Sequence, residues 1–361
     1  MSETTMARAA WTTTQPEQAG FAPGLTAKLD AGVASGLLRH LHGVLVARGG
    51  ALVLERYWDG PDEHWGRPLG HVSFGPETLH DLRSVTKGIV GLLYGIALDR
   101  GLVAPPEAPL LPAFPEYPDL AADPARMRLT VGHALTMTLG LEWDEIERPY
   151  NDPANSEIAM ESAPDRYRFI LERPVVAEPG TRWTYSGAAV ALIGALIARG
   201  VDKPLPEFAR EALFEPLGIA TVDWTAGEDG VASAASGLRL KPRDLLRVGA
   251  TAAAGGVFDG KQVVSKEWLA RSFTRAAPSF EGLDYGYLWF LGHGPAPAFP
   301  TPQRWVGAFG NGGQRLWVMP EAGLSLVVMS GNYNSPTSWV SPLRIWREIV
   351  LANMTGPAHI A

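Results

Sequence analysis

A serine and a lysine stand three positions apart just ahead of an apolar run, Gly88–Leu93. On a helix, positions i and i+3 share a face, so Ser84 and Lys87 are predicted to be neighbours one turn apart. A lysine that is buried near the positive end of a helix loses its proton more readily, and the neutral amine can accept a proton from a hydroxyl. A serine beside such a base is an activated nucleophile. The pair therefore predicts covalent catalysis at Ser84.

Ser-x-x-Lys is nevertheless a short pattern with an ordinary structural interpretation. A serine at a helix start commonly caps the helix, and a lysine one turn later is usually solvated. The apolar residues after Lys87 favour the catalytic interpretation, because a helix that is apolar on nearly every side is buried.

Two other places in the chain could contribute to the same site. Tyr185 precedes an apolar helix that begins near Gly187, where its phenol could point into a cavity, although a core tyrosine bonded to backbone is the commoner case. The glycine cluster Gly310–Gln314 separates two strand-like runs, and glycines in such a place mark a bulge or a close approach to the backbone.

Composition excludes several classes of function. The 361 residues carry a net charge of -7 and no cysteine, which argues against nucleic-acid binding and against thiolate chemistry. The eight histidines show no paired metal-ligand spacing, and His40 and His42 fall at a helix-to-strand junction, so we expect neither a metal nor a cofactor. Residues 1–14 are polar and no apolar run is long enough to span a membrane, so we expect a soluble, cytoplasmic protein with no membrane partner.

The predicted elements indicate an α/β (α+β) fold, in which a central antiparallel sheet is flanked by helices. Residues 1–101 and 227–361 are assigned to the sheet domain, residues 102–226 to a mostly helical insertion, and the active site to their junction. The segment Asp59–Leu79, rich in Gly, Pro and His, is predicted to be a loop. Strands are predicted at His42–Arg48, Ala51–Trp58, Tyr285–Leu291, Arg304–Phe309, Gln314–Met319 and Leu324–Ser330, and helices at Pro23–Leu38, Thr130–Leu139, Lys241–Ala253, Ser265–Ser272 and Val340–Met354.

Together these motifs resemble the serine hydrolases of the β-lactamase and penicillin-binding-protein fold, over roughly residues 20–355. Ser84 and Lys87 match the Ser-x-x-Lys signature. Tyr185-Ser186-Gly187 is similar to the Tyr-x-Asn motif of the class C branch, and Gly310–Gly313 falls where the family has Lys-Thr-Gly or His-x-Gly.

The departures from the family pattern are informative. Gly187 replaces an asparagine, and Asn311 replaces a lysine or histidine that holds the substrate carboxylate in β-lactam-directed members. The pattern thus looks like class C-type esterases and amidases, including the nylon-oligomer (6-aminohexanoate-dimer) hydrolase group, in which Gly-Gly-Gln follows the third motif.

The resemblance implies a serine hydrolase that forms an acyl-enzyme on small esters or amides. Ser84 would attack, Lys87 and Tyr185 would carry the proton, and the backbone N–H groups of Ser84 and Gln314 would hold the oxyanion. The residues predicted to line the substrate pocket are Asn311, Gly312, Gly313, Trp143 and Tyr150.

Three alternatives stay open at this point. They are an acyltransferase on the same scaffold, a β-lactamase or D-amino-acid peptidase, and a non-catalytic binding or sensor protein. The sequence gives no indication of the oligomeric state.

Overall fold

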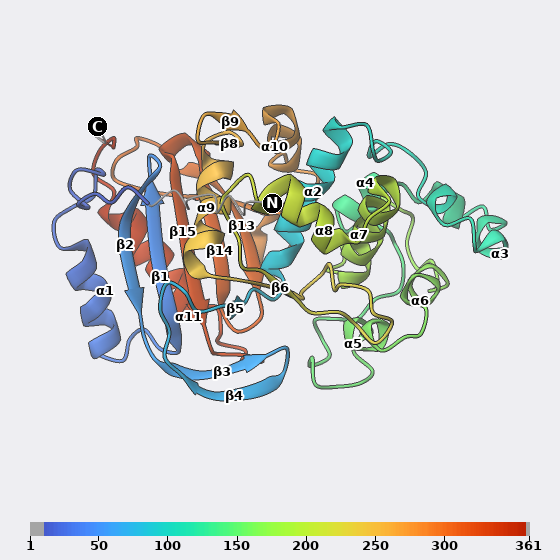
Figure 1. Cartoon of the computed structure of the whole chain (residues 1–361), viewed down its shortest axis with the longest axis horizontal. Helices are drawn as coiled ribbons and strands as arrows, with labels where there is room; N and C mark the ends of the chain where they lie inside the picture. The colour runs from blue at the N-terminus through green and yellow to red at the C-terminus, as the bar shows by residue number, and fades with distance from the viewer. Residues whose placement is uncertain (1–10, 359–361) are drawn as a thin grey trace, which may run out of the picture.

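The computed structural model describes residues 11–358 of the chain (Figure 1). Most of the polar segment 1–14, on which the expectation of a cytoplasmic protein partly depends, lies outside this range. In the described part, no helix combines the length and the apolar character that a membrane crossing requires.

The predicted central sheet is present. Its eight strands lie in the order β10-β11-β12-β13-β14-β15-β1-β2, and neighbouring strands pair antiparallel. The order places the first hairpin of the chain beside the last strand, so both ends of the sequence build one sheet (Figure 1). The strands are β1 (Leu41–Arg48), β2 (Ala51–Tyr57), β10 (Ala277–Pro278), β11 (Asp284–Tyr285), β12 (Phe290–Gly294), β13 (Gln303–Gly310), β14 (Gln314–Met319) and β15 (Leu324–Ser330).

Side chains of the central strands alternate between two hydrophobic cores. Leu316 and Val327 belong to the core that includes helix α2 (Val85–Asp99). Trp317 and Leu326 belong to the core that includes helix α1 (Leu25–Ala34) and the helical turns at 340–353. Because successive side chains of a strand point to opposite faces, a sheet covered on both sides consists of fully buried strands. All residues of β14 and β15 are buried accordingly.

The helices cover both faces of the sheet and fill the region beside it. The helices that bear on the site are α2 (Val85–Asp99), α5 (Ser156–Glu161), α7 (Gly187–Val201) and α9 (Pro242–Ala253). The others are α1 (Leu25–Ala34), α3 (Pro118–Ala121), α4 (Val131–Leu135), α6 (Arg166–Leu171), α8 (Leu205–Ala209), α10 (Lys266–Ser272) and α11 (Val340–Arg344), with the final turns continuing through Asn353.

Helix α2 is buried from Val85 to Ala97, as its apolar sequence predicts. Glycine allows it to pack closely: a β-carbon at Gly95 would lie 2.0 Å from the Trp268 ring, whose Nε1 donates a hydrogen bond to the Gly91 carbonyl at 2.9 Å. This packing fixes α2 just beyond its first turn, at which Ser84 and Lys87 lie.

Residues 102–226 form the helices α3 to α8 at one side of the sheet (Figure 1). The short strand β6 (Asp223–Trp224) at the end of this region pairs with β7 (Leu238–Leu240), which also pairs with β5 (His80–Asp81). We retain the division into a sheet domain and a helical insertion as a proposal.

Two predictions of local structure were wrong. The expected loop Asp59–Leu79 contains a hairpin, β3 (Gly60–His64) and β4 (Arg67–Val72), closed by Trp65 and Gly66, which both have positive φ. Such a turn matches the twist of a hairpin, but its exposed strand lacks the apolar alternation that marks strands in sequence. The expected strand Tyr285–Leu291 is divided between β11 and β12 by a turn in which Leu288 has a φ of 61°.

Candidate active site

Ser84 lies directly ahead of α2, and the chain reaches it through a strained residue. Arg83 has a φ of 49°, in the left-handed region that residues with a β-carbon seldom adopt. Its guanidinium is held by Glu63 at 2.5 Å and lies 5.0 Å from the centre of the Tyr333 ring. Strain of this kind concentrates at functional sites. The turn leaves Ser84 at the edge of two cavities.

Lys87 contacts Ser84 as the i, i+3 spacing predicts. Its ammonium donates a hydrogen bond to Ser84 Oγ at 2.9 Å and another to the Ala235 carbonyl at 3.0 Å. Only 2% of Lys87 is exposed, so the amine is removed from bulk water. The alternative interpretation, in which Lys87 is a solvated surface lysine, is thereby excluded.

Tyr185 joins the same group from the segment that leads into α7. The Lys87 nitrogen lies 5.0 Å from the centre of its ring, and a hydrogen bond connects its hydroxyl with Ser84. The ring stacks against Phe290 at 6.2 Å, which fixes its orientation. Burial raises the pKa of Tyr185, although Lys87 opposes this rise, so the phenol is neutral near pH 7.

The structure adds a buried carboxyl group that the sequence interpretation missed. Glu145 accepts hydrogen bonds from the Gly187 backbone at 2.5 Å, from Trp143 Nε1 at 2.8 Å and from the Tyr150 hydroxyl at 3.1 Å. Lys87 Nζ also lies near this carboxyl group, 3.7 Å from Glu145 Oε1. Glu145 thus connects the amine at Ser84 with the first residue of the helix after Tyr185.

A second carboxyl group, Glu157 of α5, is hydrogen-bonded to Glu145 and accepts a hydrogen bond from Ser236 at 2.8 Å. Burial, reinforced by Glu157, raises the pKa of Glu145 to about 8. Burial alone would also raise the pKa of Glu157, but Lys87 and the hydrogen bonds lower it overall. The pair therefore carries one negative charge near pH 7, and we treat it as a coupled unit that shares one proton.

These carboxyls alter the protonation predicted for Lys87. Burial alone would lower the pKa of Lys87, as the sequence suggested, but Tyr185, Glu157 and Glu145 raise it above its ordinary value. Tyr185 can raise the pKa of Lys87 only as a phenolate, so near pH 7 the raised pKa of Lys87 is due to Glu157 and Glu145. The resting site is then an ammonium beside one carboxylate. No local motif connects these glutamates with Lys87 in the sequence, which is why they were missed.

The same pair explains why Gly187 departs from the family pattern. A β-carbon at Gly187 would lie 3.0 Å from the Glu157 carboxyl carbon. The carboxyl group of Glu157 therefore occupies the space into which a side chain at position 187 would extend.

The end of β13 and the start of β14 approach the turn before Ser84. A β-carbon at Gly310 would lie 2.5 Å from the Leu82 carbonyl, so only glycine permits this approach. The side-chain amide of Gln314 donates a hydrogen bond to the Ser330 carbonyl at 2.5 Å and accepts one from the Ser330 backbone N–H at 3.0 Å. These bonds leave the side chain without a catalytic role of its own. Any role of Gln314 in holding an oxyanion therefore falls to its backbone N–H.

The other glycines of the cluster pack against the chain itself. A β-carbon at Gly312 would lie 2.5 Å from the Tyr333 ring, and one at Gly313 would lie 2.8 Å from the Ser338 carbonyl. Both glycines have positive φ, 85° and 96°. The need for glycine at these positions follows from internal packing, and neither residue lines the two cavities at Ser84.

Two cavities of different character meet at Ser84. The aromatic cleft measures about 520 Å³, and its walls include Phe280, Phe290, Phe309 and Trp339. The polar cleft measures about 770 Å³, and its walls include Glu63, Arg67, Glu161, Ser162 and Glu228.

Some of the predicted pocket residues line the clefts, whereas Trp143 supports the site from the protein interior. Tyr150 and Asn311 line both clefts. Trp143 lines neither cleft and acts instead as a hydrogen-bond donor to Glu145. Arg315, which the sequence interpretation missed, lines the aromatic cleft and is held by the Gly310 carbonyl at 2.9 Å. The site therefore has a cation, although position 311 does not supply it.

The chain is similar to known hydrolases along most of its length. It is 25% identical over 332 residues to the 6-aminohexanoate-dimer hydrolase of Paenarthrobacter ureafaciens. The aligned region covers 84% of this chain and 74% of the relative. It is 30% identical over 216 residues to the esterase EstB of Burkholderia gladioli, which covers 57% of this chain. The chain spans about half of that esterase, 53% of its length.

Solved structures with the same fold include EstCE1, described as a hydrolase with promiscuous acyltransferase activity. Its TM-score is 0.70 at 18% identity, with 93% of this chain and 100% of that chain covered. A penicillin-binding-protein homologue from Caulobacter crescentus has a TM-score of 0.66 at 19% identity, with coverage of 92% and 97%. At these identities the likeness establishes the fold only.

The family assignment is based on a match over most of the chain. Residues 25–349 match the family described as Beta-lactamase, and this range contains the sheet, α2 and the segment that carries Tyr185. With its Ser-x-x-Lys pair at the start of a buried helix, the chain belongs to the Beta-lactamase family of hydrolases.

Proposed function

We propose that this protein is a serine hydrolase that cleaves esters or amides of small molecules through an acyl-enzyme on Ser84. The observation that carries the proposal is the convergence of Ser84, Lys87 and Tyr185 at the meeting point of two clefts. The esterase and the 6-aminohexanoate-dimer hydrolase among its relatives support the reaction class.

The proposed reaction begins with attack of Ser84 Oγ on the substrate carbonyl carbon. The serine proton passes to Lys87 in its neutral form, and Tyr185 delivers a proton to the leaving alcohol or amine. Water then attacks the acyl-enzyme, and the same groups act in reverse to release the acid and restore Ser84.

The glutamate pair supplies a way for Lys87 to become neutral without creating net charge. An ammonium beside one carboxylate and one carboxylic acid has zero total charge. A neutral amine beside two carboxylic acids also has zero total charge. Moving the lysine proton onto the pair therefore avoids the large cost of an isolated buried charge. In this role Glu145 and Glu157 are positioning residues that act through Lys87.

The oxyanion is assigned to the backbone N–H groups of Ser84 and Gln314. Loss of one such donor typically costs about 3–4 kcal/mol of transition-state stabilisation. The strained turn at Arg83 and the close approach of Gly310 support this assignment, because they bring the two backbone segments together.

The unequal clefts suggest how a substrate is oriented. We assign an apolar acyl chain to the aromatic cleft, at whose mouth Ile146, Phe280 and Trp339 expose 55%, 38% and 45% of their surface. A polar leaving group would then occupy the polar cleft. Exposed apolar groups gathered at a cavity commonly mark a binding site.

The testing experiment is a substrate panel with matched acyl groups. We expect turnover of p-nitrophenyl butyrate and of the corresponding anilide, and only slow hydrolysis of nitrocefin. An added alcohol that diverts the acyl group into a new ester would identify an acyltransferase. Nitrocefin hydrolysis at ordinary enzyme rates would revive the β-lactamase alternative, for which Arg315 could hold the carboxylate. A flat response across the panel would indicate a non-catalytic binding protein.

A further inference from the structure

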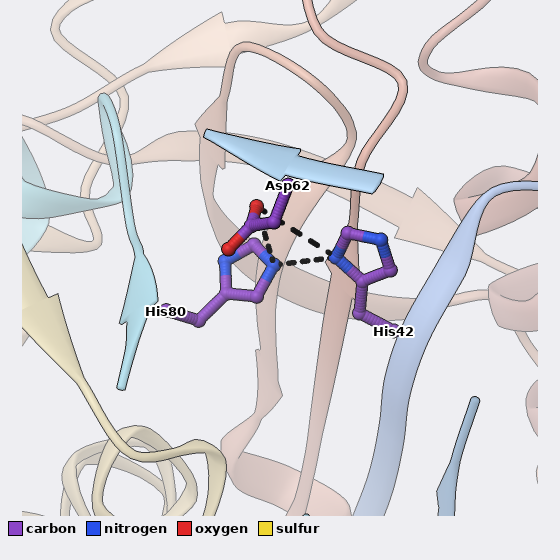
Figure 2. Close-up of side chains that lie close together, drawn as sticks. All are labelled: His42, Asp62 and His80. Atoms are coloured by element: carbon purple, nitrogen blue, oxygen red, sulfur yellow. Dashed lines mark hydrogen bonds and ion pairs between the residues drawn. The ribbon is translucent and has the colours of Figure 1, made fainter. Parts of the chain in front are cut away.

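A second group of buried polar side chains lies where β1, β3 and β5 meet (Figure 2). His42, Asp62 and His80 come from these three strands, and each is at least 94% buried. His42 Nδ1 and His80 Nε2 are 2.8 Å apart, and Oδ1 of Asp62 lies 4.0 Å from the first nitrogen and 3.8 Å from the second. The two imidazoles and the carboxylate therefore face one common point.

We propose that His42, Asp62 and His80 form a binding site for a divalent transition-metal ion of the zinc type. Imidazole nitrogen and carboxylate oxygen are ligands that zinc prefers. Ligands bound tetrahedrally at about 2.0–2.1 Å from zinc lie roughly 3.3 Å from one another. The separations here, 2.8, 3.8 and 4.0 Å, fall on both sides of that value. Small movements of the side chains would thus bring all three atoms onto an ion.

The outer hydrogen bonds of the rings suit this role. His80 Nδ1 lies 3.0 Å from the Asp81 carbonyl. Because a carbonyl can only accept, Nδ1 carries the proton and the lone pair of Nε2 faces the cluster. The His42 ring interacts with the carbonyl of Pro61. Metal-binding histidines typically donate their second N–H to a carbonyl or carboxylate in this way.

The carboxylate provides an independent argument. Asp62 Oδ1 accepts a hydrogen bond from the Tyr333 hydroxyl at 2.9 Å, whereas Oδ2 is buried without a hydrogen-bond partner among the described residues. A buried carboxylate is costly unless a positive group compensates it. The ion-pair partners of Asp62 within 4.0 Å in this part of the chain are the two imidazoles, which are ordinarily neutral at pH 7. A bound cation would supply the positive charge that this buried carboxylate lacks.

The surroundings hold the rings in place. The Phe74 ring stacks on His42 with a centroid distance of 4.0 Å. A β-carbon at Gly60 would lie 2.9 Å from His42 Nε2, and one at Gly331 would lie 2.5 Å from His42 Cε1. The absence of side chains at positions 60 and 331 thus leaves just enough space for the His42 ring. A ring that is fixed in this way favours metal binding.

An ion at this place would be structural. His80 precedes Ser84 by four positions, so the ion would tie β1 and β3 to the segment that enters α2. Neither imidazole lines the clefts at Ser84. We therefore expect metal binding to raise the melting temperature.

The test uses the full chain after chelation and desalting. After Zn²⁺ is added back and the excess is removed by a second desalting, we expect elemental mass spectrometry to find one equivalent of Zn²⁺ on the protein. Tm should rise by several degrees above that of the chelated protein. Co²⁺ in its place should give the visible absorption of a tetrahedral site. The variants Asp62→Asn and His80→Gln should weaken binding at least tenfold, whereas the double control His71→Gln/His293→Gln, at two exposed histidines, should bind like the wild type.

A wild-type protein that retains no metal above the level of a metal-free buffer control would overturn the proposal. So would unchanged binding in Asp62→Asn. Either result would mean that a proton shared between the two imidazole rings, without a metal ion, is enough to stabilise the buried cluster of His42, Asp62 and His80. The Co²⁺ spectrum of the wild type decides the matter even if a variant does not fold.

Discussion

The molecule contains two buried polar groups that differ in what surrounds them. The group proposed to be catalytic is centred on Ser84, Lys87 and the glutamate pair, and it opens onto two clefts. The histidine group at β1, β3 and β5 is enclosed by Phe74 and by backbone at two glycines. Burial in the first group arranges proton donors and acceptors beside a place for substrate. Burial in the second group fixes ligands around one point.

The largest expected effect comes from Ser84→Ala. Without the nucleophile, turnover of p-nitrophenyl butyrate should fall by about 10⁴-fold or more. Labelling by a fluorophosphonate probe should disappear as well. The matched control is Ser162→Ala, a serine in the wall of the polar cleft, which should retain both activities. A probe that labels another serine would refute the assignment.

Tyr185→Phe should have the next largest effect, a loss of about 100-fold or more in kcat, because general acid–base catalysis contributes about 10²–10⁴-fold. KM should change little, since the ring and its stacking on Phe290 remain. The measurement is a steady-state comparison with Tyr287→Phe, a tyrosine that lines neither cleft. Activity close to normal would leave Lys87 as the only proton carrier.

The glutamate pair predicts a shift in pH dependence. A carboxylate beside Lys87 favours its protonated form, so removing the charge lowers the pKa of Lys87. In the wild type, activity on the acid side is lost when the glutamate pair takes up a further proton at Glu157, whose pKa is lowered. In a variant without either carboxyl it is lost when Lys87 itself becomes protonated, so the acid limb of kcat/KM moves to higher pH. Either single variant, Glu145→Gln or Glu157→Gln, leaves one carboxyl that can ionise. Only the double variant should move the limb by about one unit or more, which corresponds to about 1.4 kcal/mol.

The wild type should also lose activity as the pH rises through about 8, where Glu145 loses its proton and a second negative charge forms beside Lys87. The control for these profiles is Glu161→Gln, a buried carboxyl one turn further along α5 that is bonded to Ser233. If the double variant has the wild-type acid limb, the glutamates do not set the proton affinity of Lys87.

The smallest effect concerns the aromatic cleft. Trp339→Ala removes apolar surface at its mouth, and a partial loss of about 1 kcal/mol of burial corresponds to an approximately fivefold higher KM for butyrate esters. Acetate esters, which are too short to reach the mouth, should change less. Leu69→Ala, at an exposed leucine of β4, serves as the control. Equal effects on both esters would place the acyl chain elsewhere.

The sequence was most informative where one segment carries the whole signal. The run after Lys87 predicted a buried helix, and the i, i+3 spacing predicted the contact with Ser84, because both depend on local geometry. The central sheet was also predictable, since the strands at its centre are covered on both faces and are mostly apolar.

Features assembled from distant segments could not be predicted in this way. Glu145 and Glu157 reach Lys87 only through the fold, and without them the sequence favoured a neutral amine. The histidine group draws on three strands about twenty positions apart, so no metal-ligand spacing appears, and the expectation of no metal depended on local patterns alone. The exposed strand β4 lacks apolar alternation, which is why its hairpin looked like a loop.

The central claim is that Ser84 carries the acyl group during turnover. Intact-mass measurement of protein quenched by acid within seconds of mixing with p-nitrophenyl butyrate tests it directly. We predict a mass increase of one butyryl group, mapped by peptide sequencing to Ser84 and absent in Ser84→Ala. Product formation with no adduct on any time scale, or an adduct that persists in Ser84→Ala, would contradict the account.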